Sequence, residues 1–356
     1  MRVTLQTIAT ELGVSRMTVS NAFSRPDQLS ADLRDRILAT ATRLGYTGPD
    51  PAARALARGA VGTVGILFTD ELEVAFTDDI ATRLLAAVGS ELHESGRGLT
   101  LLGSKAHGDF VPARDIPLDG ALVYACGAGS LAVDWLRRRG LPLVFLDQEP
   151  VQGFPCLNVD DRGGARAAAQ HLVDLGHRRV AVVSMAKHPA DVMADREHPP
   201  VPFTSRVRIE GWLDALQPAG VETTVIQATR STEETGYRLA LELLELPTRR
   251  RPTAVLAYSD RIALGIMQGL HEHGVSVPGE MSVVGFDDAS FAEHSRPALT
   301  TVRQDVTHKG RAATALLCEA IERRGTQRTD HRVLATELVV RASSGPRPGR
   351  TRLPRA

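Results

Sequence analysis

The chain has 356 residues, and its 42 basic residues are balanced by 42 acidic ones, so its formal net charge is zero. This length favours two or three domains and excludes a mini-protein. No apolar run approaches the roughly 18 residues of a membrane-spanning helix, and Met1 leads into no signal-peptide core, so we expect a cytoplasmic protein without a membrane partner. The three cysteines form no CxxC pair, which argues against a zinc site or a disulfide framework.

The charge is unevenly distributed along the chain. Residues 1–60 contain eight arginines and five acidic residues, and residues 341–356 contain five arginines and no acidic residue. These segments carry +3 and +5, so the segment between them must carry −8 for the sum to vanish. Because a basic end is a hint of nucleic-acid binding, zero net charge does not exclude a DNA partner.

Residues 4–45 predict three short helices. Thr4 can cap the first, which Gly13 ends in a turn, and Ser15 and Ser30 can cap the second and third. The apolar residues recur with helical spacing at Leu5, Ile8, Ala9 and Leu12, then Val19, Ala22 and Phe23, then Leu33, Ile37, Ala41 and Leu44. Two short helices joined by a tight turn are typical of a helix-turn-helix, although the spacing alone is equally compatible with a generic helical bundle.

Residues 50–59 predict a further helix of marginal stability. Asp50 can cap it, Pro51 suits its first position, and Gly59 ends it. About eight residues are too few for a stable lone helix in water, so we expect this segment to be ordered by what it contacts.

From Val61 onward, buried strands alternate with helices. The expected strands are 64–68, 99–102, 120–124, 143–146, 179–184, 223–227, 253–258 and 281–286. The expected helices lie near 77–95, 130–139, 161–175, 205–216, 231–246 and 260–273. This alternation is typical of a doubly wound α/β fold, and its two sets imply two sheets.

Motifs for catalysis are absent or incomplete. The chain has no GxGxxG, GxxxxGK[ST] or GxSxG sequence. Residues 127–130 follow a strand as a dinucleotide loop would, but they lack the third glycine. Ser184, His188 and Asp191 could be drawn as a triad, yet nothing nearby would form an oxyanion hole. Two histidine pairs lack further metal ligands: His171 with His177, and His271 with His273. We therefore predict no catalytic residue, no cofactor and no metal.

Several segments of the chain combine into one ordered pattern. They are Val3-Thr4-Leu5, Gly13-Val14-Ser15-Arg16-Met17-Thr18-Val19-Ser20-Asn21-Ala22, Arg36-Ile37-Leu38, Leu44-Gly45-Tyr46 and Pro51-Ala52-Ala53-Arg54-Ala55-Leu56-Ala57. This pattern closely resembles the lac/galactose repressor (LacI/GalR) family, and the resemblance continues to about residue 341. It implies an N-terminal all-α helix-turn-helix domain and an α/β periplasmic-binding-protein-like effector domain of two doubly wound subdomains.

The resemblance also implies a division of the chain. We predict a DNA-binding domain at 1–48, a hinge helix at 49–60 and an effector-binding and dimerisation domain at 61–341. The Arg/Pro-rich tail, 342–356, is expected to be disordered. No leucine heptad follows the last strand, so we expect a homodimer and not a tetramer joined by a C-terminal coiled coil.

The family resemblance assigns candidate DNA contacts. It implies that the second helix enters the major groove, where Arg16, Met17 and Asn21 would contact bases. Arginine suits guanine and asparagine suits adenine by bidentate geometry. Leu56 of the hinge helix would enter the minor groove, unless it is buried against the next domain. The candidates for the DNA backbone, which could instead only cap helices or pack the core, are Ser15, Thr18, Ser30 and Tyr46.

The resemblance implies a small-molecule effector, of the sugar or nucleobase/nucleoside class, between the subdomains. The matching positions are Phe76, Asp147, Asp160, Arg208, Ser259 and Asp287. An arginine and an aspartate facing one cleft supply donors and acceptors for hydroxyls or a purine edge, although they could also pair in an empty pocket. Residues 287–300 should lead back into the first subdomain. Two segments depart from the family pattern, 105–118, which has no helical stripe, and 186–204, a long proline-containing loop.

The sequence therefore predicts a dimeric transcriptional regulator, a repressor, that binds a double-stranded, pseudo-palindromic operator. Its affinity for DNA would change when the effector occupies the cleft. Two alternatives remain open at this point: an effector-independent regulator with a degenerate pocket, and an α/β enzyme with an appended helical domain.

Overall fold

The computed structural model describes residues 3–48, 50–68, 72–106, 108–125, 130–185, 202–323 and 329–349. Two compact units divide the chain, Met1–Gly62 and Thr63–Ala356. Among the described residues, no helix combines the length and the apolar character that crossing a membrane requires.

The first unit is entirely helical. Its helices are α1 (Leu5–Leu12), α2 (Arg16–Ser24), the short 3₁₀ helix η1 (Pro26–Gln28), α3 (Ala31–Arg43) and α4 (Pro51–Arg58). The side-chain oxygens of Thr4, Ser15 and Ser30 each accept a hydrogen bond from the backbone N–H three residues further on. Gly13 ends α1 with a φ of 66°, a conformation that glycine adopts at little cost. The core of α1, α2 and α3 is made of the predicted residues Ile8, Ala9, Val19, Ala22, Ile37 and Ala41.

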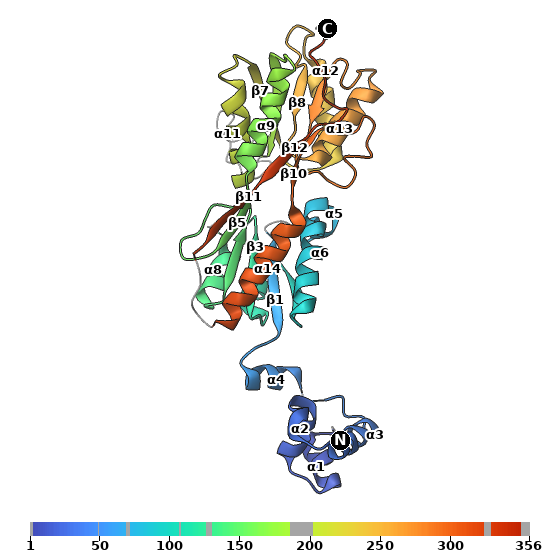
Figure 1. Ribbon diagram of the computed structural model, residues 1–356, viewed down its shortest axis with the longest axis vertical. Helices are drawn as coiled ribbons and strands as arrows, with labels where there is room; N and C mark the ends of the chain where they lie inside the picture. The colour runs from blue at the N-terminus through green and yellow to red at the C-terminus, as the bar shows by residue number, and fades with distance from the viewer. Residues whose placement is uncertain are drawn as a thin grey trace, which may run out of the picture. The chain divides into compact units, whose positions relative to one another are not determined.

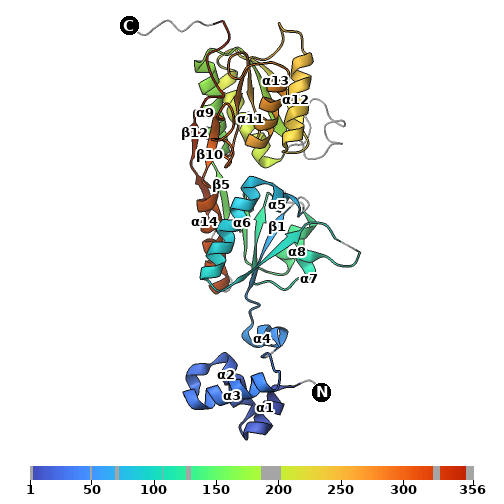
Figure 2. The same ribbon diagram turned by 90° about the vertical axis from the view of Figure 1, so that its right-hand side faces the viewer.

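The second unit contains two parallel sheets. The first sheet has the strand order β11-β5-β4-β3-β1-β2. Its strands are β1 (Thr63–Phe68), β2 (Gly98–Gly103), β3 (Gly120–Tyr124), β4 (Leu143–Leu146), β5 (Cys156–Val159) and β11 (His331–Leu334). One face is covered by α6 (Asp79–Glu94) and α14 (Val306–Glu322), and the other by α7 (Pro112–Asp115) and α8 (Leu131–Arg138) (Figure 2). The short helix α5 (Val74–Thr77) precedes α6.

The second sheet is smaller and has the strand order β7-β6-β8-β9. Its strands are β6 (Arg179–Met185), β7 (Glu222–Ala228), β8 (Ala254–Leu256) and β9 (Ser282–Val284). Helices α9 (Asp161–Asp174) and α11 (Phe203–Leu216) pack on one face, and α12 (Glu233–Glu245) and α13 (Asp260–Glu272) on the other. Both sheets are therefore sandwiched between helices, as the doubly wound prediction requires.

The chain passes between the two subdomains three times. The crossings follow β5, β10 (Thr301–Gln304) and β11, and the last leads into β12 (Thr336–Val339). β10 and β12 pair with each other in antiparallel register. Figure 1 shows this two-stranded ribbon beside the junction of the subdomains. Residues at the crossings therefore touch both halves of the unit.

One expected path of the chain is wrong. Residues 287–300 do not lead back into the first subdomain, because they stay hydrogen-bonded to the second sheet. The Gly285 N–H donates to the Thr300 carbonyl, and the Asp287 N–H to that of Val302. Leu299 is also buried in the core of the second subdomain. The crossing occurs later, between β10 and α14, and neither of these elements was among those predicted from the sequence.

The start of the predicted disordered tail is ordered. Ser343 is fully buried, and its hydroxyl accepts from the Thr300 N–H and donates to the Val283 carbonyl. The Gly345 carbonyl lies 3.0 Å from Nε2 of buried His177. The low apolar content of the tail predicted disorder, but residues 343–345 are ordered by hydrogen bonds to other elements, which composition does not reveal. Residues 350–356 lie outside the described part of the chain, as do 186–201 of the long loop, while segment 105–118 contains the short helix α7.

Candidate functional site

The second helix presents a polar face away from the core of the first unit. Val19 and Ala22 are buried, whereas Met17 is 70% exposed and Arg16 is exposed. Asn21 is half-buried, and its amide donates to Oε1 of Gln28 at 3.1 Å. The side chains predicted to contact bases thus share the outward side of α2, because the helical period directs the apolar residues inward.

The residues predicted to contact the DNA backbone also have roles inside the unit. The Ser15 hydroxyl accepts from the Thr18 N–H at 3.0 Å, and the two hydroxyls lie 2.8 Å apart. Ser30 caps α3 through the Leu33 N–H at 3.4 Å. The Tyr46 ring packs edge-on against Phe23, with 5.6 Å between ring centroids. Capping and core packing are therefore present at these positions.

The predicted hinge helix is present as α4. Asp50 Oδ1 accepts from the Ala53 N–H at 3.3 Å, and Gly59 has a φ of 63°. Leu56 is 87% exposed, so it is not buried in the helical core of the first unit.

A cavity of about 570 Å³ lies between the two subdomains of the second unit. Tyr124, Ala125 and Asp147 line it from the carboxyl ends of the first sheet's strands. Ligands of open α/β folds bind at such strand ends. The second subdomain contributes residues that include Arg208, Ser259 and Asp287. Four of the six predicted effector residues therefore lie in one cavity.

Arg208 is the buried cation on the side of the second subdomain. Its Nε donates to Asp161 Oδ1 at 2.8 Å, and its Nη2 lies 3.5 Å from Asp287 Oδ1. The guanidinium also lies over the Phe286 ring, 3.6 Å from the centroid. Burial by itself would lower the pKa of Arg208, but Asp161 and Asp287 raise it above its ordinary value. Arg208 is thus a fixed positive charge.

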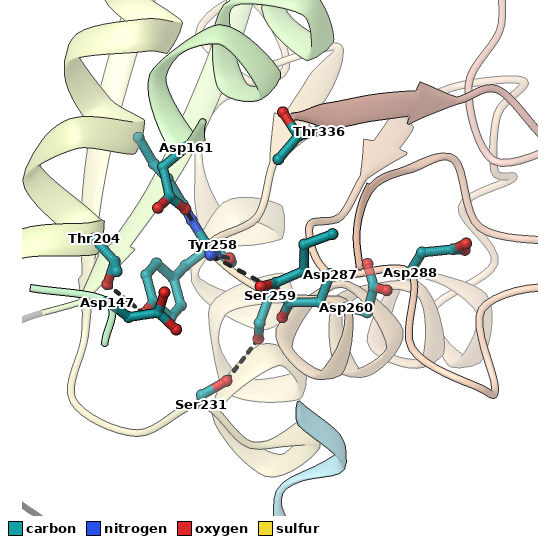
Figure 3. Close-up of polar contacts among 12 residues, drawn as sticks. Asp147, Asp161, Thr204, Ser231, Tyr258, Ser259, Asp260, Asp287, Asp288 and Thr336 are labelled. Carbon is teal, nitrogen blue, oxygen red and sulfur yellow. Dashed lines mark hydrogen bonds and ion pairs between the residues drawn. The ribbon is translucent and has the colours of Figure 1, made fainter. Parts of the chain in front are cut away.

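Asp287 is held in an unfavourable environment for a carboxylate. Burial raises its pKa to about 7, although Arg208 acts in the opposite direction. Oδ1 accepts from Nε2 of Gln304 at 2.7 Å. Asp161 and Asp260 also have pKa values raised, first of all by burial. Arg208 is therefore paired with two buried carboxyl groups, those of Asp161 and Asp287. Figure 3 shows both of these aspartates together with Asp260 in the second subdomain.

A second buried cation lies on the side of the first subdomain. Lys309, in the first turn of α14, is fully buried and donates from Nζ to Asp147 Oδ2 at 2.5 Å. It also donates to Oε1 of Gln304 at 2.9 Å. Because the Gln304 amide donates to Asp287, the two subdomains are linked through the crossing by a continuous chain of polar contacts.

The backbone is strained where it lines this cavity. Ala125 and Asp147 each have a φ of 53°, and Asp287 has a φ of 118°. Such conformations are costly for residues other than glycine and persist where the surrounding contacts hold them. All three residues follow strands at their carboxyl ends, so the strain directs them toward the cavity.

Two predicted effector residues do not line the cavity. Phe76 is 65% exposed on the short helix α5. Asp160 caps α9, where its Oδ1 accepts from the Gly163 N–H at 2.9 Å. The cap position turns Asp160 outward, and the next residue, Asp161, points inward to Arg208. Sequence matching did not distinguish two adjacent aspartates, and only the start of the helix determines which one is buried.

Sequence reasoning also missed Lys309, Gln304 and Tyr258. Lys309 had a signal, because it is one of only three lysines in the chain, with Lys105 and Lys187. Tyr258 lines the cavity, and its hydroxyl lies 3.0 Å from that of Thr204. Ser259, which was predicted, caps α13 and lies 2.6 Å from the Ser231 hydroxyl (Figure 3).

The structure describes only some of the residues in the rejected catalytic and metal motifs. Residues 126–129 of the glycine-containing loop lie outside the described part of the chain. So do His188 and Asp191, two members of the hypothetical Ser184-His188-Asp191 triad. His177 is buried and hydrogen-bonded, with Nδ1 2.8 Å from the Thr253 hydroxyl. Within the described part of the chain, no cluster of three or more metal-ligating side chains occurs.

The chain was compared with known proteins. Residues 4–48 match the family described as bacterial regulatory proteins, lacI family, and residues 169–344 match the periplasmic binding protein-like domain. An HTH-type transcriptional regulator of Mycobacterium tuberculosis is 38% identical, covering 97% of this chain and 98% of the relative. These matches define the class: DNA-binding transcriptional regulators that join a helix-turn-helix to a periplasmic-binding-protein-like domain.

Two solved structures extend the comparison. The transcriptional regulator CelR in complex with cellobiose is 27% identical, covers 96% of this chain and 100% of its own, and has a TM-score of 0.66. The lac repressor dimer bound to operator and the anti-inducer ONPF is 22% identical over 97% of this chain and 100% of its own, with a TM-score of 0.76, and supports the fold alone. The chain belongs to the LacI family, which is a family of transcriptional regulators.

The buried pair of Asp147 and Lys309 makes a prediction about stability. Lys309→Met should lower the free energy of unfolding of the second unit by about 3–5 kcal/mol, because it leaves a buried carboxylate without its cation. The double variant Asp147→Asn/Lys309→Met should lose less than the sum of the single losses. Urea denaturation followed by tryptophan fluorescence measures this, since Trp135 and Trp212 both lie in that unit. The matched control removes the exposed pair of Glu319 and Arg323 at the end of the same helix, which should change the free energy of unfolding little. Strictly additive losses at Asp147 and Lys309 would contradict the pairing.

The raised pKa of Asp287 makes a prediction about pH. A carboxyl whose pKa is higher in the folded state stabilises the fold when protonated, and this contribution is lost as pH rises from about 4 through about 7. Asp287→Asn keeps an oxygen that can accept from Gln304 but removes the titrating group. The free energy of unfolding, measured from about pH 5 to about pH 8, should therefore fall less steeply with pH in this variant than in the wild type. Asp288→Asn is the control: although partial burial opposes them, Arg303 and Arg341 lower the pKa of Asp288, so it titrates below that window. An unchanged slope in Asp287→Asn would show that this carboxyl does not titrate as described.

Proposed function

We propose that this protein is a ligand-responsive transcriptional repressor that binds a pseudo-palindromic operator as a homodimer in the cytoplasm. The observation that carries the proposal is the cavity, in which buried charged side chains from two subdomains meet, on the same chain as an exposed helix-turn-helix face. The protein acts by binding and not by turnover.

The DNA-binding roles are assigned by chemistry and exposure. Arg16, Met17 and Asn21 form the outward side of α2 and supply the base contacts, with Arg16 suited to guanine and Asn21 to adenine. Caps and helix N-termini favour phosphate, so Ser15, Thr18 and Ser30 supply backbone contacts, together with Tyr46. These contacts place the protein on the duplex, and base contacts provide the sequence specificity.

The hinge segment converts ligand binding into a change of DNA affinity. In this proposal, 1–48 is the DNA-binding domain, 49–60 the hinge and 61–341 the effector and dimerisation domain. Ligand in the cavity changes the angle between the subdomains and with it the spacing of the two hinge segments in the dimer. A helix as short as α4 is ordered or released by a small free-energy difference.

The effector is a small hydroxyl-bearing molecule of the sugar or nucleoside class. Asp147, Ser259, Asp287 and Tyr258 supply acceptors and hydroxyls around the cavity. The related regulator CelR has been solved with cellobiose, and a family member of Enterococcus faecium with ribose. Phe76 and Asp160 are outside this cavity and are not included among the contacts.

Selection of duplexes from a random pool tests the DNA-binding part of the proposal. The wild-type protein should enrich one palindrome with two half-sites, and Arg16→Ala should lose about 10- to 100-fold in affinity with relaxed preference at one base pair of each half-site. Arg208→Ala should keep operator affinity but lose the response to effector, because it lies in the other unit. Enrichment of no sequence by the wild-type protein would refute the proposed function.

Leu56 gives a separate prediction for the hinge. Leu56→Ala should weaken binding to the selected operator more than binding to random-sequence DNA, because an apolar wedge acts only where the duplex is kinked. Equilibrium titrations of both duplexes at one salt concentration measure the two losses. Leu131→Ala, which removes a leucine 78% exposed on α8, is the matched control and should change neither affinity. Equal losses on both duplexes would argue against the wedge.

A further inference from the structure

The inner end of the cavity contains a single buried polar network. It runs from Asp161 through Arg208, Asp287, Gln304 and Lys309 to Asp147. Asp147, Arg208, Asp287 and Gln304 line the cavity, whereas Lys309 is fully buried behind them. Lys309 therefore acts on anything in the cavity only through its neighbours.

Asp147 has one oxygen committed to the protein and one available for hydrogen bonding. Oδ2 accepts from Lys309, while Oδ1 is buried and has no hydrogen-bond partner among the described residues. The residue is only 7% exposed and lines the cavity. A buried carboxylate oxygen without a donor is costly, so a donor placed in the cavity beside Oδ1 gains a favourable contact.

The charges of the network are unequal. Asp147, Asp161 and Asp287 contribute −3, and Arg208 and Lys309 contribute +2, which leaves −1, or zero when Asp287 is protonated near its pKa of about 7. In neither state is the sum of these five groups positive, while the rest of the cavity lining adds two acidic residues, Glu73 and Asp78, and three basic ones, Lys105, Arg230 and Arg261. An anionic group entering this end would lose its hydration without gaining a compensating positive charge, whereas a hydroxyl pays no such cost.

We infer that the inner end of the cavity is a recognition subsite for an uncharged, hydroxyl-bearing end of the effector, and that Lys309 is the positioning residue that sets its charge selectivity. This inference rests on the proposed function. Asp147 makes the contact, accepting from a ligand hydroxyl through Oδ1. Lys309 donates to Oδ2, which leaves Oδ1 as the acceptor for a ligand, and its contact helps to hold Asp147 in its left-handed conformation with a φ of 53°.

The inference predicts opposite effects for two variants. Lys309→Met makes the network more negative by one charge, so it should reject anionic ligands more strongly than the wild type does. Asp147→Asn removes a negative charge, so it should reject them less strongly. Both variants should bind the neutral ligand at least about tenfold more weakly, since each disturbs a charge-assisted hydrogen bond. A merely structural role would move the selectivity of both variants in the same direction.

The test uses matched pairs of ligands that differ in charge. Glucose is paired with glucuronate, galactose with galacturonate, and ribose with ribose 5-phosphate, and binding to the full-length dimer is measured by thermal shift and calorimetry. The wild type should bind the neutral member of at least one pair at least about tenfold more tightly than its anionic partner. Thr314→Val, which removes a buried hydrogen bond elsewhere on α14, is the matched control and should keep the wild-type selectivity.

The outcomes separate this inference from the proposed function. An anionic ligand that binds as tightly as its neutral partner, or a shift of selectivity in the same direction in both variants, would overturn the subsite. A wild-type protein that binds its selected operator but none of the neutral ligands would also overturn it. Loss of operator binding by the wild type refutes the proposed function instead. Native tryptophan fluorescence from Trp135 and Trp212, which lie in the same unit as both substitutions, shows that both variants fold.

Discussion

The arrangement of the effector domain depends on the cost of burying charge. Arg208 and Lys309 lie almost without solvent between two subdomains, and each is paired with a carboxylate that would be equally costly alone. Gln304 joins the two pairs, so neither subdomain can move without altering the contacts of the other. A ligand that supplies a donor at this point acts directly on the interactions that hold the subdomains together.

The topology explains why these charges meet. Parallel strands present their carboxyl ends at one edge of a sheet, and Asp147 follows β4 there. Gln304 and Lys309 lie on either side of a crossing between subdomains, at the end of β10 and the start of α14. The crossing thereby places the polar side chains of Gln304 and Lys309 between the two subdomains. Asp147 and Asp287 adopt backbone conformations with positive φ in order to reach this site, which costs conformational free energy at both residues.

Local patterns predicted the helix-turn-helix with most of its detail. The caps at Thr4, Ser15 and Ser30 and the outward position of Met17 follow from side-chain chemistry and from the period of the helix. Four of the six predicted effector residues, Asp147, Arg208, Ser259 and Asp287, also line one cavity, as the family resemblance implied. The family to which the chain belongs could also be predicted from the sequence, because its motifs are contiguous.

The sequence by itself determined the alternation of strands and helices up to about residue 286, the capped helices of the DNA-binding domain and the class of regulator. The tertiary structure alone decided that Asp161 and not Asp160 contacts Arg208, that Lys309 is buried against Asp147, and that residues 343–347 are hydrogen-bonded to the second subdomain. The physical reason is the separation in sequence over which the interactions act. Helix periodicity and capping act over three or four residues, whereas Lys309 and Asp147 are 162 positions apart and meet only when both sheets have formed.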